Sequence, residues 1–106
     1  MKFQVRLTLK AEQDAAAVMD WFRQQQEVEA GSRWFGQLMA ANDTLETMPQ
    51  RCPIAAEAPE AGVEIRELLV GRRRSRYRVI FLIDKPAVHI LRIWHSARDA
   101  ISREDL

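Results

Sequence analysis

The sequence predicts an α+β fold with the element order β-α-α-β-β-β, in which an N-terminal helical hairpin packs on one face of an antiparallel sheet. Two patterns support this class. Apolar residues alternate with period two near the start of the chain and over its last third, whereas the stretch between follows a helical period. The 106 residues are enough for one hydrophobic core, so we expect a single domain over residues 1–106.

The N-terminal part is predicted to form one strand and two helices. The strand covers residues 3–9, "FQVRLTL", because its apolar and polar residues alternate. From Ala11 the period becomes helical, and this helix should run for about four turns to the glutamines at 24–26. A second helix is expected after Gly31 with Ser32 as its N-cap. The short break between the helices favours an antiparallel hairpin, and we interpret their Trp and Met residues as core.

A connection without regular structure is expected next. Residues 46–62 hold three of the four prolines and show no clear period, which is typical of a loop. Residues 63–70, "VEIRELLV", are predicted to form a strand because they are rich in β-branched and aliphatic side chains. At the other end of the chain, the polar tail 96–106 is expected to be a short helix or a frayed end.

The last two strands are predicted to form a hairpin. Residues 77–84 are apolar on both faces, which indicates a central strand covered on both sides. The turn falls at 84–87 and contains Pro86. Strict alternation in the last strand would place one set on one face and a second set on the other: Val88, Ile90, Arg92 and Trp94 against His89, Leu91, Ile93 and His95.

Composition narrows the class of protein. A net charge of +1 gives no general sign of nucleic-acid binding. No apolar run approaches the ~18 residues of a membrane span, so we expect no membrane partner. The first ten residues alternate and lack the apolar core of a signal peptide. Cys52 is the single cysteine, which we interpret as an inert thiol in a cytoplasmic protein.

Several catalytic and cofactor motifs are missing from the sequence. It contains no glycine-rich phosphate loop, no CxxC or HxxxH spacing and no GxSxG elbow. His89 and His95 on one strand would lie about 20 Å apart, too far to share a metal ion. We therefore expect neither a metal nor a cofactor, and we interpret His89 as a packed or edge histidine.

The strongest candidate site is a basic rim at one end of the sheet. Arg78 opens a strand and His95 ends its antiparallel neighbour, so the two should lie close together, with Arg66 and the arginine turn 72–76 nearby. Such a rim could clamp a phosphodiester, or it could be a solvated edge that pairs with acidic side chains of a partner. The acidic run at 57–67 is interpreted as a solvated face. If the rim acts as a nuclease, the candidate catalytic residues are His95, Arg78 and Arg98. The candidate partner-binding residues are Arg66, Arg72, Arg73, Arg74, Arg76 and Arg92.

Four stretches in this order resemble the RelE/ParE superfamily, the toxins of type II toxin–antitoxin systems that include plasmid stabilisation proteins. They are "LETMPQRCP", "EIRELLVG", "YRVIFLID" and "ILRIWHSARD". The resemblance covers nearly the whole chain. It implies a small cytoplasmic, bacterial, growth-inhibiting toxin whose groove is wrapped by the C-terminal segment of a cognate antitoxin in a hetero-oligomer.

The superfamily divides by mechanism. RelE-type members cleave messenger RNA on the ribosome by a metal-free 2′-hydroxyl attack, whereas ParE-type members poison DNA gyrase. Arg78 and Arg98 match arginines of the nuclease branch, but the two strand lysines of that branch fall at or near Glu64 and Arg66. No aromatic residue lies in 100–106 to match its C-terminal tyrosine, although His95 could substitute as a base.

The ParE-like branch therefore fits the residues best. We expect a toxin that binds DNA gyrase and is neutralised by its antitoxin, which should offer carboxylates to the arginine rim. Two alternatives stay open: a ribosome-dependent mRNA endonuclease of RelE type, and a degenerate, non-toxic interaction domain. Whether the chain is an enzyme is undecided at this stage; if it is, the resemblance implies a metal-free endoribonuclease.

Overall fold

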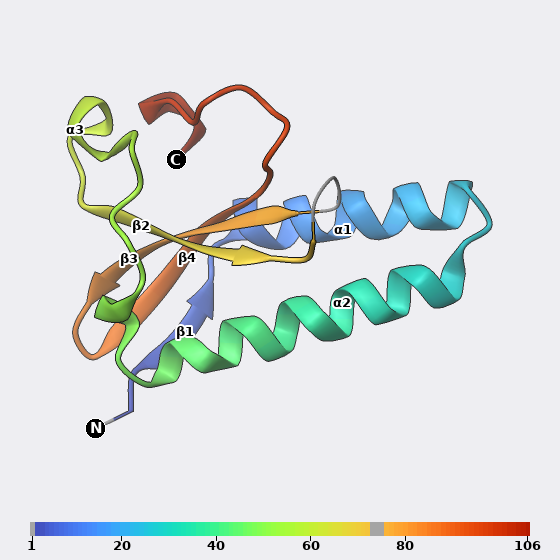
Figure 1. Cartoon of the computed structure of the whole chain (residues 1–106), viewed down its shortest axis with the longest axis horizontal. Helices are drawn as coiled ribbons and strands as arrows, with labels where there is room; N and C mark the ends of the chain where they lie inside the picture. Colours follow the sequence, from blue (N-terminus) through green and yellow to red (C-terminus); the bar gives the residue numbers. More distant parts are fainter. Residues whose placement is uncertain (1, 73–75) are drawn as a thin grey trace.

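The computed structural model describes residues 2–72 and 76–106, which form a four-stranded sheet with a helical hairpin on one face (Figure 1). The strands lie in the order β1-β4-β3-β2. Arg73 and Arg74 lie outside the described residues. The elements are β1 (Gln4–Leu7), α1 (Leu9–Gln24), α2 (Val28–Asp43), α3 (Ala58–Ala61), β2 (Ile65–Val70), β3 (Tyr77–Asp84) and β4 (Ala87–His95), with 3₁₀ turns at Thr44–Glu46, Pro49–Arg51 and Arg103–Asp105.

The sheet is mixed, which corrects the predicted antiparallel arrangement in one place. β2, β3 and β4 are antiparallel, but β1 pairs with β4 in parallel, with Val5 opposite Val88. Alternation in residues 3–9 indicates a strand but carries no information on its direction. The α+β class and the element order are confirmed.

Both long helices begin earlier than predicted. Thr8 caps α1 with its hydroxyl, which accepts a hydrogen bond from the Ala11 N–H at 3.2 Å, so the helix starts at Leu9. α2 starts at Val28, which places Ser32 inside the helix instead of at its N-cap. The connection is short because Gln26 turns the chain with a φ of 58°. The antiparallel hairpin itself is as predicted.

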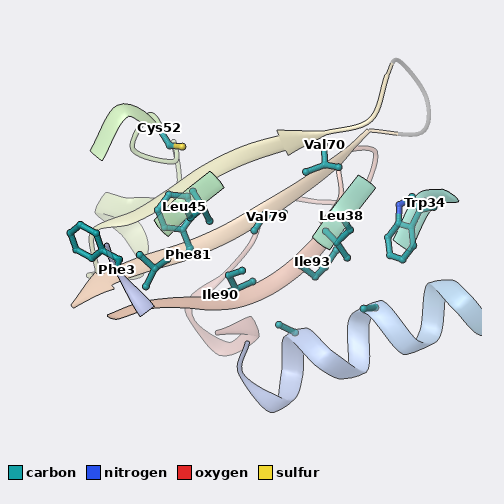
Figure 2. Packing of buried hydrophobic residues seen from close by; sticks show 13 residues of the cluster. Phe3, Trp34, Leu38, Leu45, Cys52, Val70, Val79, Phe81, Ile90 and Ile93 are labelled. Atoms are coloured by element: carbon teal, nitrogen blue, oxygen red, sulfur yellow. The ribbon is translucent and has the colours of Figure 1, made fainter. Parts of the chain in front are cut away.

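The main hydrophobic core lies between the helices and the sheet (Figure 2). β3 contributes Val79 and Phe81 to it, and α2 contributes Leu38, all three fully buried. Side chains of a strand alternate between its two faces, and the odd-numbered residues of β3 all point toward the helices.

The opposite face of the sheet carries a second, smaller core. Ile80 and Trp94 are buried there under α3 and the C-terminal tail, which lie near each other in Figure 1. The tail inserts Ile101, and the segment before β2 inserts Ala58 and Ala61. The prediction that β3 is covered on both sides is confirmed, and the predicted loop 46–62 contains two short turns and α3.

A β-bulge in β4 changes which residues face the helices. Phe81 pairs with Ile90 and Ile80 pairs with Arg92, so Leu91 is the extra residue. Ile90 therefore shares the helix side with Ile93, while Arg92 and Trp94 point to the opposite face. The predicted face assignment, which assumed strict alternation, holds through Leu91 and is wrong from Arg92 onward.

Candidate functional site

A row of five aromatic rings crosses the molecule from α1 to β4. The ring centroids are 5.2 Å apart for Trp21 and Phe22, and 6.3 Å apart for Phe22 and Trp34. They are 5.2 Å apart for Trp34 and Tyr77, and 4.9 Å apart for Tyr77 and His95. Most of the contacts are edge-to-face, a geometry that the electrostatics of aromatic pairs favours. We call these five residues the aromatic row.

Backbone geometry explains why the row forms. Tyr77 and His95 are directly opposite each other in the β3–β4 register, on the side of the sheet that faces the helices. Trp34 occupies the buried side of α2. Gly31 lets the helices approach, because a Cβ at this position would lie 3.0 Å from the Phe22 Cβ.

One groove, the aromatic groove, runs along this row. It has a volume of about 570 Å³ and is lined by all five rings together with Ala17, Val18 and Glu27. Trp21 is 52% exposed, so the groove has an apolar wall that faces solvent. Glu27 is the carboxylate of this lining, which contains no lysine or arginine among the described residues.

Neighbouring groups determine which polar atoms of His95 and Tyr77 can donate hydrogen bonds. His95 Nδ1 accepts a hydrogen bond from the Ala97 N–H at 3.0 Å, so the neutral ring carries its proton on Nε2. Burial raises the pKa of the Tyr77 hydroxyl, which keeps it protonated at neutral pH. Both groups can therefore donate hydrogen bonds to a bound partner.

A second groove, the arginine groove, lies beside the first and shares Phe22 and Trp34 with it. Its volume is about 620 Å³, and it extends from α2 to the end of β2. Among the described residues, Arg33 and Arg72 are the basic members of its lining, which also includes Ala30, Gln37, Ala41, Leu69, Val70 and Gly71. The Trp34 Nε1 is buried and has no hydrogen-bond partner among the described residues.

Arg78 lies on the opposite face of the sheet, inside an ion-pair cluster. Both of its terminal nitrogens donate to the Glu57 carboxylate at 2.7 Å, and its Nε donates to Glu67 at 2.7 Å. The Arg78 and Glu57 side chains are only 15% and 11% exposed. The interpretation of residues 57–67 as a solvated face is thus wrong for Glu57 and Glu67.

The cluster also shifts the proton affinities of its members. Hydrogen bonds from Arg78 lower the pKa of Glu57 from 4.5 to about 2, and the Ile101 N–H adds a further hydrogen bond at 3.1 Å. The same contact raises the pKa of Arg78. Glu57 therefore links three parts of the chain: the start of α3, β3 and the C-terminal tail.

The predicted convergence of His95 with the arginines is only partly found. Arg78 is opposite Trp94, whereas His95 is opposite Tyr77, so the two predicted catalytic residues project to opposite faces of the sheet. Arg98 stacks on the Trp94 ring with its guanidinium carbon 3.6 Å from the centroid, which places it on the Arg78 side. A common rim for all three is therefore wrong.

The predicted partner-binding arginines are also distributed more widely than expected. Arg66 lies three positions along β2 from the partner of Arg78, and it donates to the carbonyls of Gln50 and Cys52. Arg92 forms a two-bonded ion pair with Asp14. Arg76 is exposed next to β3, and of the described arginines in this set only Arg72 lines a groove.

The sequence reasoning missed the aromatic row as a surface feature. Trp34 is buried as predicted, but Trp21 is not a core residue. The available signal was position: Trp21 lies at the edge of the helical stripe formed by Ala11, Ala15, Val18 and Phe22, and a residue at that edge can face solvent. The counter-ions Asp14, Glu57 and Glu67 carried no local signal, because their partners are distant in sequence.

Neither a metal site nor a membrane span is found in the part of the chain that the structure describes. Within residues 2–72 and 76–106, no three His, Cys, Asp or Glu side chains lie close enough to hold a metal ion. None of the helices formed by these residues has the length and apolarity needed to cross a bilayer.

One comparison with known proteins identifies the family, and a second supports the fold. The family model described as the ParE toxin of the type II toxin–antitoxin system parDE matches residues 5–100. A solved chain from the chromosomal ParDE TA system of P. aeruginosa superposes with a TM-score of 0.73 at 19% sequence identity. The match covers 89% of this chain and 96% of that one, and at this identity it shows the fold. A comparison with curated protein sequences gives no match.

Proposed function

Because this chain belongs to the ParE toxin family of type II toxin–antitoxin systems, we propose that it arrests bacterial growth by binding DNA gyrase. We propose further that a cognate antitoxin, which membership of this family implies, neutralises it by occupying the aromatic groove. The free thiol of Cys52, buried and with a pKa raised by its burial, is consistent with a reducing cytoplasm as the place of action.

The observation that supports protein binding over RNA cleavage is the state of Arg78. A phosphodiester clamp needs an arginine whose donors can reach a phosphate close to the general acid or base. All three nitrogens of Arg78 instead donate to the carboxylates of Glu57 and Glu67. Moving Arg78 out of this cluster would leave the buried carboxylates without a counter-ion. Binding a substrate phosphate through Arg78 would therefore cost free energy.

The position of His95 supports the same conclusion. Its ring belongs to the aromatic groove, separated from Arg78 by the sheet itself. In that groove it contacts Tyr77 edge-to-face and can donate a hydrogen bond to a docked protein segment. The role that this geometry favours for His95 is recognition of a partner.

The test is a pair of assays on the purified chain. Supercoiling of relaxed plasmid by DNA gyrase should be inhibited in proportion to the amount of chain, and antitoxin added first should prevent the inhibition. Messenger RNA on programmed ribosomes should stay intact under the same conditions. Ribosome-dependent cleavage that disappears in His95→Ala and Arg98→Ala variants would overturn the proposal in favour of the nuclease.

Growth provides the control for the third alternative. Expression of the chain without its partner should stop growth, and co-expression with the cognate antitoxin should restore it. Normal growth at confirmed protein levels would contradict the proposal and favour a degenerate interaction domain.

A further inference from the structure

The two grooves that meet at Phe22 and Trp34 carry opposite charges. Glu27 gives the aromatic groove a negative charge, and Arg33 and Arg72 give the arginine groove two positive charges. We infer that both grooves bind one segment of the cognate antitoxin, which places a basic side chain in the aromatic groove and an acidic side chain in the arginine groove. This inference rests on the proposed neutralisation by an antitoxin, and it adds the chemistry and direction of the bound segment.

The aromatic groove has the composition of a receptor for a cation. Lysine and arginine side chains bind over aromatic faces, most strongly over tryptophan, when the charge lies within about 6 Å of the ring centre. Trp21, Trp34 and Tyr77 supply such rings, and their chain of contacts holds them in a fixed arrangement. Glu27 adds a carboxylate that can pair with the same cation.

The arginine groove has the complementary composition. Arg33 and Arg72 each offer a planar fork of donors, which suits a carboxylate better than any neutral group. The buried Trp34 Nε1, without a partner among the described residues, belongs to the residue that forms the wall between the grooves. Phe22 completes this wall, so an apolar residue of the segment should pack on it between the two charged anchors.

Opposite charges on the two sides of this wall would fix the direction of the bound segment. A segment docked in reverse would bring its acidic residue to Glu27 and its basic residue to Arg33, and like charges at close range disfavour that arrangement. The same rule would reject antitoxins with a different charge order. Glu27 and Arg33 would therefore act as specificity-determining residues for the antitoxin.

An antitoxin fits these grooves better than a second copy or a transient target. Trp21 is more than half exposed, and it borders a groove of about 570 Å³ that adjoins a second groove of about 620 Å³. An exposed aromatic wall of this kind favours a partner that stays bound, because exposed apolar patches favour association. A type II toxin has such a partner in its cognate antitoxin.

The experiment reverses the charges one at a time. The probe is the purified cognate antitoxin, and its dissociation constant is measured by titration calorimetry. Glu27→Lys and Arg33→Glu should each weaken binding about tenfold or more. Matched controls are Glu29→Lys and Lys10→Glu, at exposed helix positions outside both groove linings, which should leave the constant within about twofold.

Compensating charge reversals in the antitoxin test which of its side chains binds in each groove. Reversing one basic residue of the antitoxin should restore binding to Glu27→Lys, and reversing a different, acidic residue should restore binding to Arg33→Glu. Unchanged affinity of both variants would overturn the inference, as would rescue with the opposite pattern. Glu27→Gln, which keeps the shape of the side chain, and Arg33→Gln, which removes the charge with a shorter side chain, should change affinity in the same direction and guard against a folding defect.

If a second copy of the chain or DNA gyrase occupied the grooves, the same variants would give different results. If the free chain dimerises and the variants break the dimer without changing antitoxin affinity, the grooves bind a second copy and the inference is wrong. Loss of gyrase inhibition with intact antitoxin binding would also contradict it. Failure of the wild-type chain to inhibit gyrase would end the proposed target alone, because antitoxin affinity is measured separately.

Discussion

Arg78 and His95 are one register step apart at the same end of the sheet, yet their side chains leave it on opposite faces. His95 joins the aromatic row with Tyr77, while Arg78 is enclosed by the carboxylates of Glu57 and Glu67. The first environment is suited to binding a partner. The second holds α3, the sheet and the C-terminal tail together.

The Glu57–Arg78 pair should contribute strongly to stability. Glu57→Gln leaves the Arg78 charge largely buried with a weaker partner, so we expect the free energy of unfolding to fall by about 3 kcal/mol. Urea denaturation followed by circular dichroism measures this change. Glu60→Gln, at an exposed position of the same short helix, is the control and should change stability by less than about 0.5 kcal/mol. A loss below that limit for Glu57→Gln would contradict the role assigned to the pair.

The Glu57–Arg78 pair should make the free energy of unfolding depend on pH in the acidic range. The pKa of Glu57 falls from 4.5 to about 2 on folding, so its contribution is fully present above 4.5 and disappears as the pH falls toward 2. The difference in unfolding free energy between the wild type and Glu57→Gln should therefore be constant at neutral pH and shrink over this acidic range. A difference independent of pH down to 2 would show that Glu57 does not gain its stabilisation as a carboxylate.

Two glycines of α2 provide a matched test of the helical hairpin. Gly31→Ala would place a methyl group 3.0 Å from the Phe22 Cβ, and the helices would have to separate, at a cost of about 1–3 kcal/mol. Gly36→Ala meets no atom within 4 Å, and should stabilise the helix by about 0.5–1 kcal/mol. Thermal melts of both variants check the prediction. Equal effects of the two substitutions would mean that the contact with Phe22 does not limit the approach of the helices.

Trp21 should matter for binding and little for folding. Since this side chain is half exposed at the rim of the aromatic groove, Trp21→Ala should weaken antitoxin binding by about 10-fold to 100-fold. The melting temperature should change little. Val28→Ala, at an exposed apolar position outside both groove linings, is the control for lost hydrophobic surface. A large fall in melting temperature with unchanged binding would assign Trp21 to the core instead.

Local sequence patterns predicted most of the elements but not how they combine. The period of apolar residues located the helices and strands, and the two-sided apolar pattern of 77–84 correctly indicated a central strand. It could not reveal that β1 runs parallel to β4, because alternation is the same in both directions. The bulge at Leu91 was hidden for a similar reason: one extra residue changes the faces without changing the composition.

The candidate site was harder to predict than the fold. Proximity in an antiparallel pair correctly brought Arg78 and His95 to one end of the sheet, but neighbouring positions on a strand face opposite sides. The counter-ions of Arg78 come from Glu57 and Glu67, at sequence distances of 21 and 11 residues. Such pairings depend on tertiary packing, which no local pattern contains.

The central claim is that this toxin acts by binding a protein and not by cutting RNA. The most direct test follows cells in the first minutes after the chain is expressed alone, measuring reporter-plasmid topology and the 5′ ends of messenger RNA in the same samples. We expect plasmid supercoiling to be lost while the messages stay uncut. New 5′ ends within coding regions, appearing before any change in supercoiling, would contradict the account.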